Sequence, residues 1–128
     1  MSTRANVIIK EGKEQLFFYR HSDGYPETTE PVLKIFLSWL KDRKIRNNIS
    51  QASGWLVLLG AMEYNNVPKY NIDTEKCETL TFDMCTFVEN PKDWKVGAFE
   101  PTTGIHGDIE YLYTIDLIKE TLITEKYR

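Results

Sequence analysis

The chain has 128 residues, 41% of them apolar, a formal net charge of −3 and a sequence pI of about 5.4. This length and apolar fraction predict a single domain with one ordinary core rather than two independent domains. The slightly acidic balance provides no basic field of the kind that attracts nucleic acid, so direct DNA binding is not expected.

The cysteines and the apolar runs favour a cytoplasmic protein without a membrane segment. The longest apolar run, Trp55 to Leu59, is far too short to cross a bilayer. Cys77 and Cys85 form neither a CxxC pair nor part of a His-rich ligand set, and no secretory leader follows Met1. We therefore expect both cysteines to be reduced thiols and the protein to act in the cytoplasm.

The first elements are predicted to form a β-hairpin. Asn6 to Lys10 is rich in β-branched residues, Glu11 to Glu14 is polar and contains a glycine, and Gln15 to Tyr19 is apolar again. The second strand should continue into residues 20–21. The turn-forming residues from Ser22 to Pro26 then predict a change of direction.

A helix should follow, from Pro31 to about Ile45. Proline is well tolerated at the first position of a helix, and Thr28 or Thr29 can cap it. Its apolar stripe follows the i, i+3, i+4, i+7 rule and comprises Leu33, Phe36, Leu37 and Leu40, widened by Val32, Ile35 and Trp39. The basic residues near its end are interpreted as complements of the helix dipole rather than as a phosphate-binding patch; they are Lys41, Arg43, Lys44 and Arg46.

A second helix is predicted from about Ile49 to Tyr64, with the Asn-Asn pair at 47–48 forming the turn and the cap before it. Its apolar stripe comprises Ala52, Trp55, Leu56, Leu59 and Met62. Gly54, Gly60 and Ala61 would let a neighbouring backbone approach closely, in spite of the cost of glycine in a helix. The two helices are expected to form a hairpin packed on one face of a sheet.

The second half of the chain is predicted to supply the remaining strands. Residues 65–93 are expected to be mostly loop, with one short element around Leu80 to Val88. Strands should run from Trp94 to Phe99, from Ile109 to Leu117 and from Thr121 to Tyr127, with a loop from Glu100 to Asp108 after the first. One buried face should hold the alternating residues Ile109, Tyr111, Tyr113, Ile115 and Leu117. All elements together predict a single α+β domain over residues 1–128, a mainly antiparallel sheet of about five strands with a helical hairpin on one face.

The chain contains two histidines, and each stands two residues before an aspartate: His21 with Asp23, and His106 with Asp108. Residues i and i+2 of a strand project to the same side, so two strand ends could bring the pairs together. The set would suit a zinc or manganese ion, or a metal-free site in which one imidazole is base and the other acid toward a phosphodiester. The alternative is ordinary turn chemistry, since Ser-Asp-Gly and His-Gly-Asp are common turn sequences.

Aromatic and charged residues form a second candidate set. It comprises Tyr19, Arg20, Tyr25, Trp94, Glu110, Tyr111 and Tyr113. Aromatic faces and an arginine can stack on and pair with a nucleotide or another flat anion, although packing within a sheet accounts better for Tyr111 and Tyr113. Arg20 follows an apolar strand and is well placed to grip a carboxylate or a phosphate. No phosphate loop, dinucleotide fingerprint, nucleophile elbow or HExxH helix occurs.

Three segments of the chain are distinctive: STRANVIIK at residues 2–10, YRHSDGYP at 19–26 and GIHGDIEYLY at 104–113. In these segments the chain resembles a group of short, mostly uncharacterised proteins encoded by bacteriophages and prophages. The resemblance implies an accessory protein that acts in the cytoplasm of the bacterial host. Small phage proteins of this kind often bind a host enzyme or a signalling nucleotide used in defence, so the resemblance also implies a counter-defence role. It supplies no catalytic residues to transfer.

The leading hypothesis is a non-catalytic protein that binds a host factor or a small anionic ligand, such as a nucleotide. Its ligand-binding residues would be Arg20, His21, Asp23, Tyr25, His106 and Asp108. The second hypothesis is a small phosphodiesterase, in which the two His-x-Asp pairs are the catalytic residues or, in a metal-dependent version, the ligands of a divalent metal; no other cofactor is expected. A third is a structural role in a homo-oligomer or a virion complex.

Overall fold

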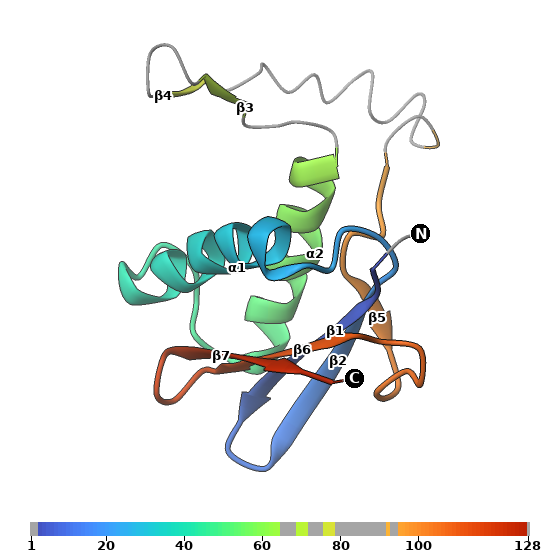
Figure 1. Cartoon of the computed structure of the whole chain (residues 1–128). Helices are drawn as coiled ribbons and strands as arrows, with labels where there is room; N and C mark the ends of the chain where they lie inside the picture. Colours follow the sequence, from blue (N-terminus) through green and yellow to red (C-terminus); the bar gives the residue numbers. More distant parts are fainter. Residues whose placement is uncertain (1–2, 65–68, 72–75, 79–91, 93–94, 128) are drawn as a thin grey trace.

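The computed structural model describes residues 3–64, 69–71, 76–78, 92 and 95–127. One sheet contains, in spatial order, β5 (Glu100–Thr102), β2 (Glu14–Arg20), β1 (Ala5–Glu11), β6 (Tyr111–Asp116) and β7 (Thr121–Lys126). Two helices, α1 (Pro26–Lys41) and α2 (Ile49–Tyr64), lie on one face of this sheet (Figure 1). A separate ribbon pairs β3 (Lys69–Asn71) with β4 (Lys76–Glu78). The predicted α+β class is therefore confirmed.

The hairpin at the start of the chain is confirmed. β1 and β2 pair antiparallel from Ala5 opposite Arg20 to Glu11 opposite Glu14. Gly12 closes the turn with φ +61°, a left-handed conformation that glycine adopts without a steric penalty. The β-branched residues of β1 are buried on both sides of the sheet, because β1 lies at its centre.

Helix α1 begins at Pro26, so the expected start at Pro31 is wrong. Pro26 occupies the first helical position, where its missing N–H is an unpaired group in any helix. The amides of Thr28 and Thr29 donate to the carbonyl of Tyr25, and this nucleates the first turn before Pro31 is reached. Pro31 therefore lies inside the helix, where it removes one backbone hydrogen bond.

The same helix ends at Lys41, earlier than the predicted end near Ile45. Arg43 has φ +58°, its amide donates to the carbonyl of Leu40, and the amide of Lys44 donates to Trp39. These two bonds form a Schellman motif with arginine at the position that glycine usually takes. Most of the predicted basic cluster therefore follows the helix instead of forming its last turn.

Helix α2 agrees with its prediction in both bounds and cap. The side-chain oxygen of Asn48 accepts from the amide of Gln51 at 2.9 Å, a standard N-cap. Ala52, Leu56 and Leu59 of the expected stripe are buried, whereas Trp55 is 38% exposed.

The central strand pair, β1 with β6, is parallel, while the other three pairs of the main sheet are antiparallel. The core lies between this sheet and the helices, where Val7 and Ile9 of β1 pack with Leu33 and Phe36 of α1. A smaller cluster lies on the opposite face and contains Ile8, Tyr19, Ile109 and Leu112, with Phe17 packed against it. Ile109 thus belongs to the smaller cluster, and the predicted alternation of buried residues holds from β6 onward.

The strand expected from Trp94 to Phe99 is not formed over its described part, residues 95–99. Gly97 has φ +116°, which breaks the extended path, and Ala98 and Phe99 turn into the core. There their side chains pack on Gly60, where an added Cβ would lie 2.7 Å from Phe99 Cδ2, so the close approach predicted here for a neighbouring backbone is made by side chains instead. β5 begins only afterwards, inside the segment predicted as loop.

Several predictions fall outside the described residues. These concern the element at Leu80 to Val88, the thiol of Cys85 and the side chain of Trp94; Cys77 is described as part of β4 by its backbone alone. The C-terminal strands agree with the prediction as β6 and β7, joined at residues 117–120. Within the described part of the chain, no helix has the length and apolarity needed to span a membrane.

Candidate functional site

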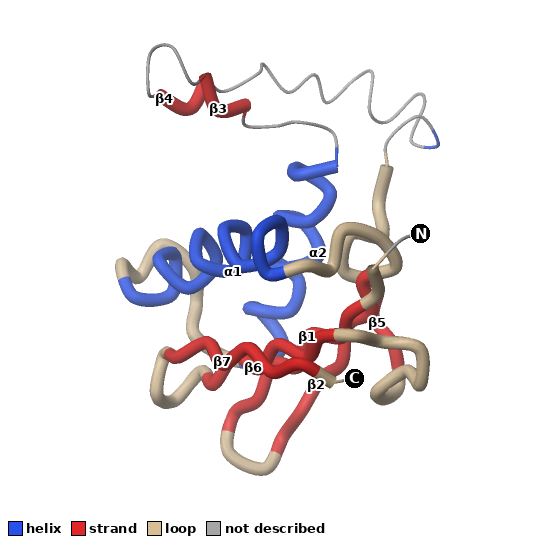
Figure 2. The backbone as a smooth tube through the Cα atoms, viewed as in Figure 1, coloured by secondary structure: helices blue, strands red, loops and turns tan. Residues whose placement is uncertain are grey.

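Tyr19 lies at the centre of a polar cluster on the sheet face that points away from the helices. Tyr19 is 8% exposed and packs in the small hydrophobic cluster with Ile8, Ile109 and Leu112. Strand alternation directs Phe18 to the opposite, helix-covered face, where it is part of the main core. The loop between β5 and β6, drawn in tan in Figure 2, supplies the other half of the cluster.

The two histidines meet at this tyrosine. The imidazole of His106 stacks on the Tyr19 ring, with centroids 3.9 Å apart and planes at 15°. His21 approaches the same ring at 5.8 Å between centroids, and its Nδ1 lies 3.2 Å from the tyrosine hydroxyl. The two histidines therefore approach the same ring, as expected, but only His21 does so from a strand end; His106 lies in the loop between β5 and β6.

Asp108 joins the cluster and sets the direction of its hydrogen bonds. The Tyr19 hydroxyl donates to Asp108 Oδ2 at 2.9 Å, because a carboxylate only accepts. The phenol oxygen is then free to accept from His21 Nδ1, which places the proton of the neutral ring on that nitrogen. The Nε2 lone pair of His21 consequently faces away from the cluster, and the residue is exposed.

Arg4 is a member of the cluster that the sequence did not indicate. Its Nε lies 3.2 Å from Asp108 Oδ2 and 3.4 Å from His21 Nδ1. The carboxylate is the stronger acceptor, and a protonated Nδ1 cannot accept, so Arg4 donates to Asp108. Its side chain is 37% exposed, and among the described residues its hydrogen bond and ion pair involve only Nε, so its two terminal nitrogens are available to a ligand.

Residues of the sheet strands β1 and β5 hold His106 in place. Its backbone amide donates to Asn6 Oδ1 at 2.7 Å, and its Nε2 lies 2.9 Å from the hydroxyl of Thr102. Asn6 is fully buried in β1 and also donates to the carbonyl of Phe18. A lone asparagine in a β-branched strand is the sequence signal that could have identified this anchor, because a buried amide needs partners.

The Tyr19 hydroxyl remains a proton donor across the physiological range. Burial raises its pKa above the ordinary value, and the hydrogen bond to Asp108 and the charge of that carboxylate raise it further, while Arg4 lowers it. A neutral phenol therefore links the carboxylate to the imidazole of His21. The hydrogen bonds from His21 to Tyr19 and from Tyr19 to Asp108 orient the imidazole, and the phenol between them stays neutral.

Arg20, predicted to grip a ligand, has a partner inside the protein. Its guanidinium is 1% exposed and forms a bidentate ion pair with Glu63 of α2, at 2.8 and 3.0 Å. Its Nε donates to the carbonyl of Asp23, and its Cζ lies 5.0 Å from the centre of the Phe99 ring. The side chain is on the helix-covered face, opposite to Tyr19, so it lies outside the histidine cluster.

Asp23 and Tyr25 are placed by the turn between β2 and α1. Asp23 has φ +58°, and its carbonyl accepts from the hydroxyls of Thr28 and Thr29 at 2.6 and 2.9 Å. The predicted turn role of Ser-Asp-Gly is thus observed, with the backbone carbonyl rather than the carboxylate as acceptor. Tyr25 is 46% exposed and lies 6.1 Å from the ring of Tyr111.

The remaining aromatic residues are structural. Tyr113 is fully buried, and its hydroxyl donates to the carbonyl of Gly24 at 2.6 Å. Burial raises the pKa of Tyr113 far above its ordinary value. The preference for sheet packing at Tyr111 and Tyr113 agrees with these contacts, and Glu110 contributes its backbone amide and carbonyl to Arg4 and Tyr127.

The four-residue metal set predicted from the His-x-Asp pairs does not assemble. No group of three or more His, Cys, Asp or Glu side chains that could hold a metal ion is found among the described residues. The histidines and Asp108 surround the Tyr19 phenol instead. Asp23 is held in the turn before α1, where its carbonyl accepts from Thr29. The metal-dependent version of the hypothesis is therefore not supported by the geometry.

Comparisons of the chain with protein-family models, with curated proteins and with solved structures found no match. The fold and the cluster define a small α+β domain that carries two imidazoles and a guanidinium around a buried tyrosine. Any conclusion about function therefore depends on the chemistry of these side chains.

Proposed function

We propose that the chain is a binding protein for a small anionic ligand, and that the ligand carries a phosphate group, as nucleotides do. The observation that carries the proposal is that Arg4 and His21 lie side by side at an exposed edge of the cluster, with Nε of Arg4 3.4 Å from Nδ1 of His21. A guanidinium and an imidazole side by side are suited to the oxygens of one phosphate.

Both cationic groups are oriented before a ligand arrives. Asp108 holds Nε of Arg4, and Tyr19 holds Nδ1 of His21, so the outer nitrogens of both side chains point away from the cluster. Preorganisation of this kind lowers the entropy lost on binding, because the side chains do not have to be ordered by the ligand. The arrangement therefore favours a small ligand with a compact charge.

A thermal-shift screen with inorganic phosphate, linear nucleotides and cyclic nucleotides tests the proposal. A ligand at 100 times its Kd should add about 2.7 kcal/mol to the stability of the folded protein. We expect Arg4→Ala and His21→Ala to abolish the shift. Lys13→Ala, which removes a cation from the hairpin turn far from the cluster, should leave it unchanged.

Two outcomes would contradict this function. An equal thermal shift for Arg4→Ala and the native chain would place the ligand elsewhere. The absence of a shift with every probe at millimolar concentration would exclude the phosphate class, and the remaining binding hypothesis would be a host protein.

A metal-free phosphodiesterase is the second candidate, and one observation favours it. Asp108, Tyr19 and His21 form a hydrogen-bonded chain that leaves a lone pair on Nε2 of His21, as a general base requires. His106 stacks on the same phenol ring, and in this reaction it would act as the acid. Release of p-nitrophenolate from bis(p-nitrophenyl) phosphate, lost in both His21→Ala and His106→Ala, would support catalysis; turnover unaffected by either substitution would exclude it.

The resemblance to phage and prophage proteins supports an accessory role in the cytoplasm of a bacterial host. In that setting, capture of a signalling nucleotide would withdraw it from a host defence system. Expression of the chain in a bacterium with a nucleotide-signalled defence should restore phage growth, and Arg4→Ala should not. Equal restoration by both would contradict nucleotide capture.

A further inference from the structure

The sheet has two edges, and they differ in their capacity to pair with another strand. β5 forms one edge, has three residues and contains Pro101, which has no N–H to donate. β7 forms the other edge with six residues and no proline. Unpaired backbone groups on such an edge can accept an additional strand.

The register shows which backbone groups of β7 are free. The amide of Tyr127 donates to the carbonyl of Glu110, so these two residues form a hydrogen-bonded pair. Hydrogen-bonded and non-hydrogen-bonded pairs alternate along an antiparallel ladder, which makes Ile123 opposite Thr114 another hydrogen-bonded pair. The N–H and C=O groups of Leu122 and Thr124 therefore point outward from the sheet edge.

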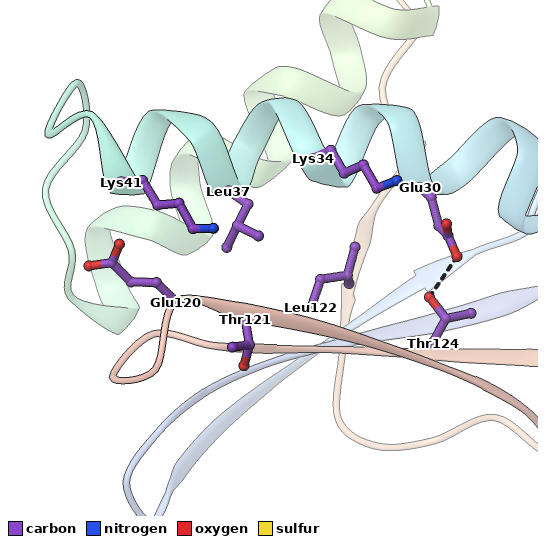
Figure 3. A pocket seen from close by; sticks show the side chains of 8 residues that line it. All are labelled: Glu30, Lys34, Leu37, Lys41, Glu120, Thr121, Leu122 and Thr124. Carbon is purple, nitrogen blue, oxygen red and sulfur yellow. Dashed lines mark hydrogen bonds between the residues drawn. The ribbon is translucent and has the colours of Figure 1, made fainter.

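A groove of about 340 Å³ lies between this edge strand and α1 (Figure 3). It is lined by Glu30, Lys34, Leu37, Lys41, Glu120, Thr121, Leu122 and Thr124. Leu37 from the helix and Leu122 from the strand point toward each other in its middle. The groove follows the strand, and the residues with outward backbone groups also contribute side chains to it.

The helix side of the groove carries two lysines, Lys34 and Lys41, and one glutamate, Glu30, so it has a small excess of positive charge. Glu120 accepts an ion pair from Arg43 at 3.4 Å, and Glu30 accepts a hydrogen bond from Thr124 at 2.9 Å. Lys34 and Lys41 form no ion pair with any described residue and lie two helical turns apart, on either side of Leu37. A ligand with acidic groups at its ends and an apolar group between them would complement this surface.

We propose that the groove binds an extended acidic peptide segment of another protein, which adds to the sheet as a strand beside β7. Alternate side chains of the added strand would face the groove. The spacing from residue i−2 to i+2 of a strand is about 13 Å, and the two lysines are about 10.5 Å apart along the helix, within reach of their flexible side chains. The recognised pattern is therefore acidic-x-apolar-x-acidic, with the apolar side chain on Leu37 and Leu122.

This surface is separate from the site proposed for the anionic ligand. The cluster of Arg4 and His21 lies on the open face of the sheet, whereas the groove lies on the helix side at the β7 edge. Loss of one activity should leave the other intact. The two proposals can therefore fail independently.

The test uses a fluorescent seven-residue peptide with glutamate at positions 2 and 6, valine at 4 and threonine elsewhere. We expect saturable binding in fluorescence anisotropy, weakened about tenfold or more in the Lys34→Glu/Lys41→Glu variant, because each lysine loses an ion pair and gains a repulsion. Lys13→Glu is the matched control and should bind like the native chain. In NMR spectra the amides of Leu122 and Thr124 should shift on titration, and a peptide with N-methylated valine should not bind.

Three results would overturn the proposal. Equal affinity of the double variant and the control would remove the charge complementarity. Amide shifts confined to residues outside β7 would show that the peptide does not add to the edge. A dimer in sedimentation equilibrium that the double variant retains, together with no peptide binding, would identify a second copy of the chain as the occupant of the edge.

Discussion

The hydroxyl of Tyr19 donates a 2.9 Å hydrogen bond to the carboxylate of Asp108, a residue 89 positions away in the sequence. This bond fixes the loop between β5 and β6 to the open face of the sheet. It also makes one phenol the common support of Arg4, through the carboxylate, and of His21, through its Nδ1. The placement of Asp108 and His21 therefore depends on one oxygen atom, whereas His106 is held by the Tyr19 ring, Asn6 and Thr102.

Removal of that oxygen should affect both stability and binding. Tyr19→Phe is expected to lower the free energy of unfolding by about 1 to 1.5 kcal/mol, since Asp108 is half exposed and water can replace part of the bond. Tyr25→Phe is a matched control at an exposed ring and should change stability by less than about 0.5 kcal/mol. Urea unfolding measures both, and equal values for the two variants would contradict the role of the Tyr19 hydroxyl.

The buried ion pair between Arg20 and Glu63 should be costly to break from one side. Glu63→Leu leaves a guanidinium that is 1% exposed without its carboxylate, which should cost about 3 kcal/mol. The double variant Arg20→Met/Glu63→Leu replaces both charges by apolar groups. Its free energy of unfolding should differ from that of the native chain by less than about 1.5 kcal/mol. Urea unfolding of a double-mutant cycle checks this; a double variant at least as unstable as the single one would show that the pair itself stabilises the fold.

Local patterns allowed the hairpin, α2 and the two C-terminal strands to be predicted, because turn residues, caps and periodicity are encoded by neighbours in the sequence. The parallel pairing of β1 with β6 could not be predicted in this way. It pairs residues that are far apart in the sequence, such as Val7 and Tyr113. The helices between the two strands make a parallel connection possible, but they do not determine which strands pair. The strand expected before Phe99 was wrong for a similar reason, since Gly60 offers that ring a place in the core.

The placement of the candidate residues was predicted in part. Both histidines contact Tyr19, but only His21 stands at a strand end, since His106 lies in the loop between β5 and β6. The anchor of His106, Asn6, became evident only from contacts across the sheet. Alternation along β2 could have excluded Arg20, because it must point away from the face that Tyr19 and His21 share. Arg4 carried no local signal, since it precedes the first strand.

The left-handed residue at the end of α1 gives a stabilising substitution. Arg43 has φ +58° in the Schellman motif, a conformation that costs a residue with a Cβ about 1 to 2 kcal/mol. Arg43→Gly removes this strain, adds conformational entropy to the unfolded chain and loses an exposed ion pair to Glu120, so the net gain should be about 0.5 to 1 kcal/mol. Thermal unfolding measures the gain. Lys44→Gly is the control and should give none; an equal gain there would point to a cause other than backbone strain.

Asp116 should make the fold sensitive to acid. Its Oδ1 accepts from the amides of Lys119 and Ile118 at 3.2 and 2.9 Å, in the turn between β6 and β7. These bonds, that from Lys119 first, hold the pKa of the carboxyl below its ordinary value of 3.8, with a smaller contribution from Lys10. Because the pKa is lower in the folded state, this stability is present above pH 3.8 and is lost as the pH falls through the folded value.

Urea unfolding between pH 2 and 6 tests this effect. Asp116→Asn keeps an oxygen that can accept both amide bonds but cannot ionise, so its free energy of unfolding should fall less than that of the native chain at low pH. Lys10→Met removes the charge 3.7 Å from the carboxylate and should retain most of the acid dependence, since the backbone amides contribute more than the lysine. If Lys10→Met flattened the profile as much as Asp116→Asn, the ion pair rather than the turn would control the titration.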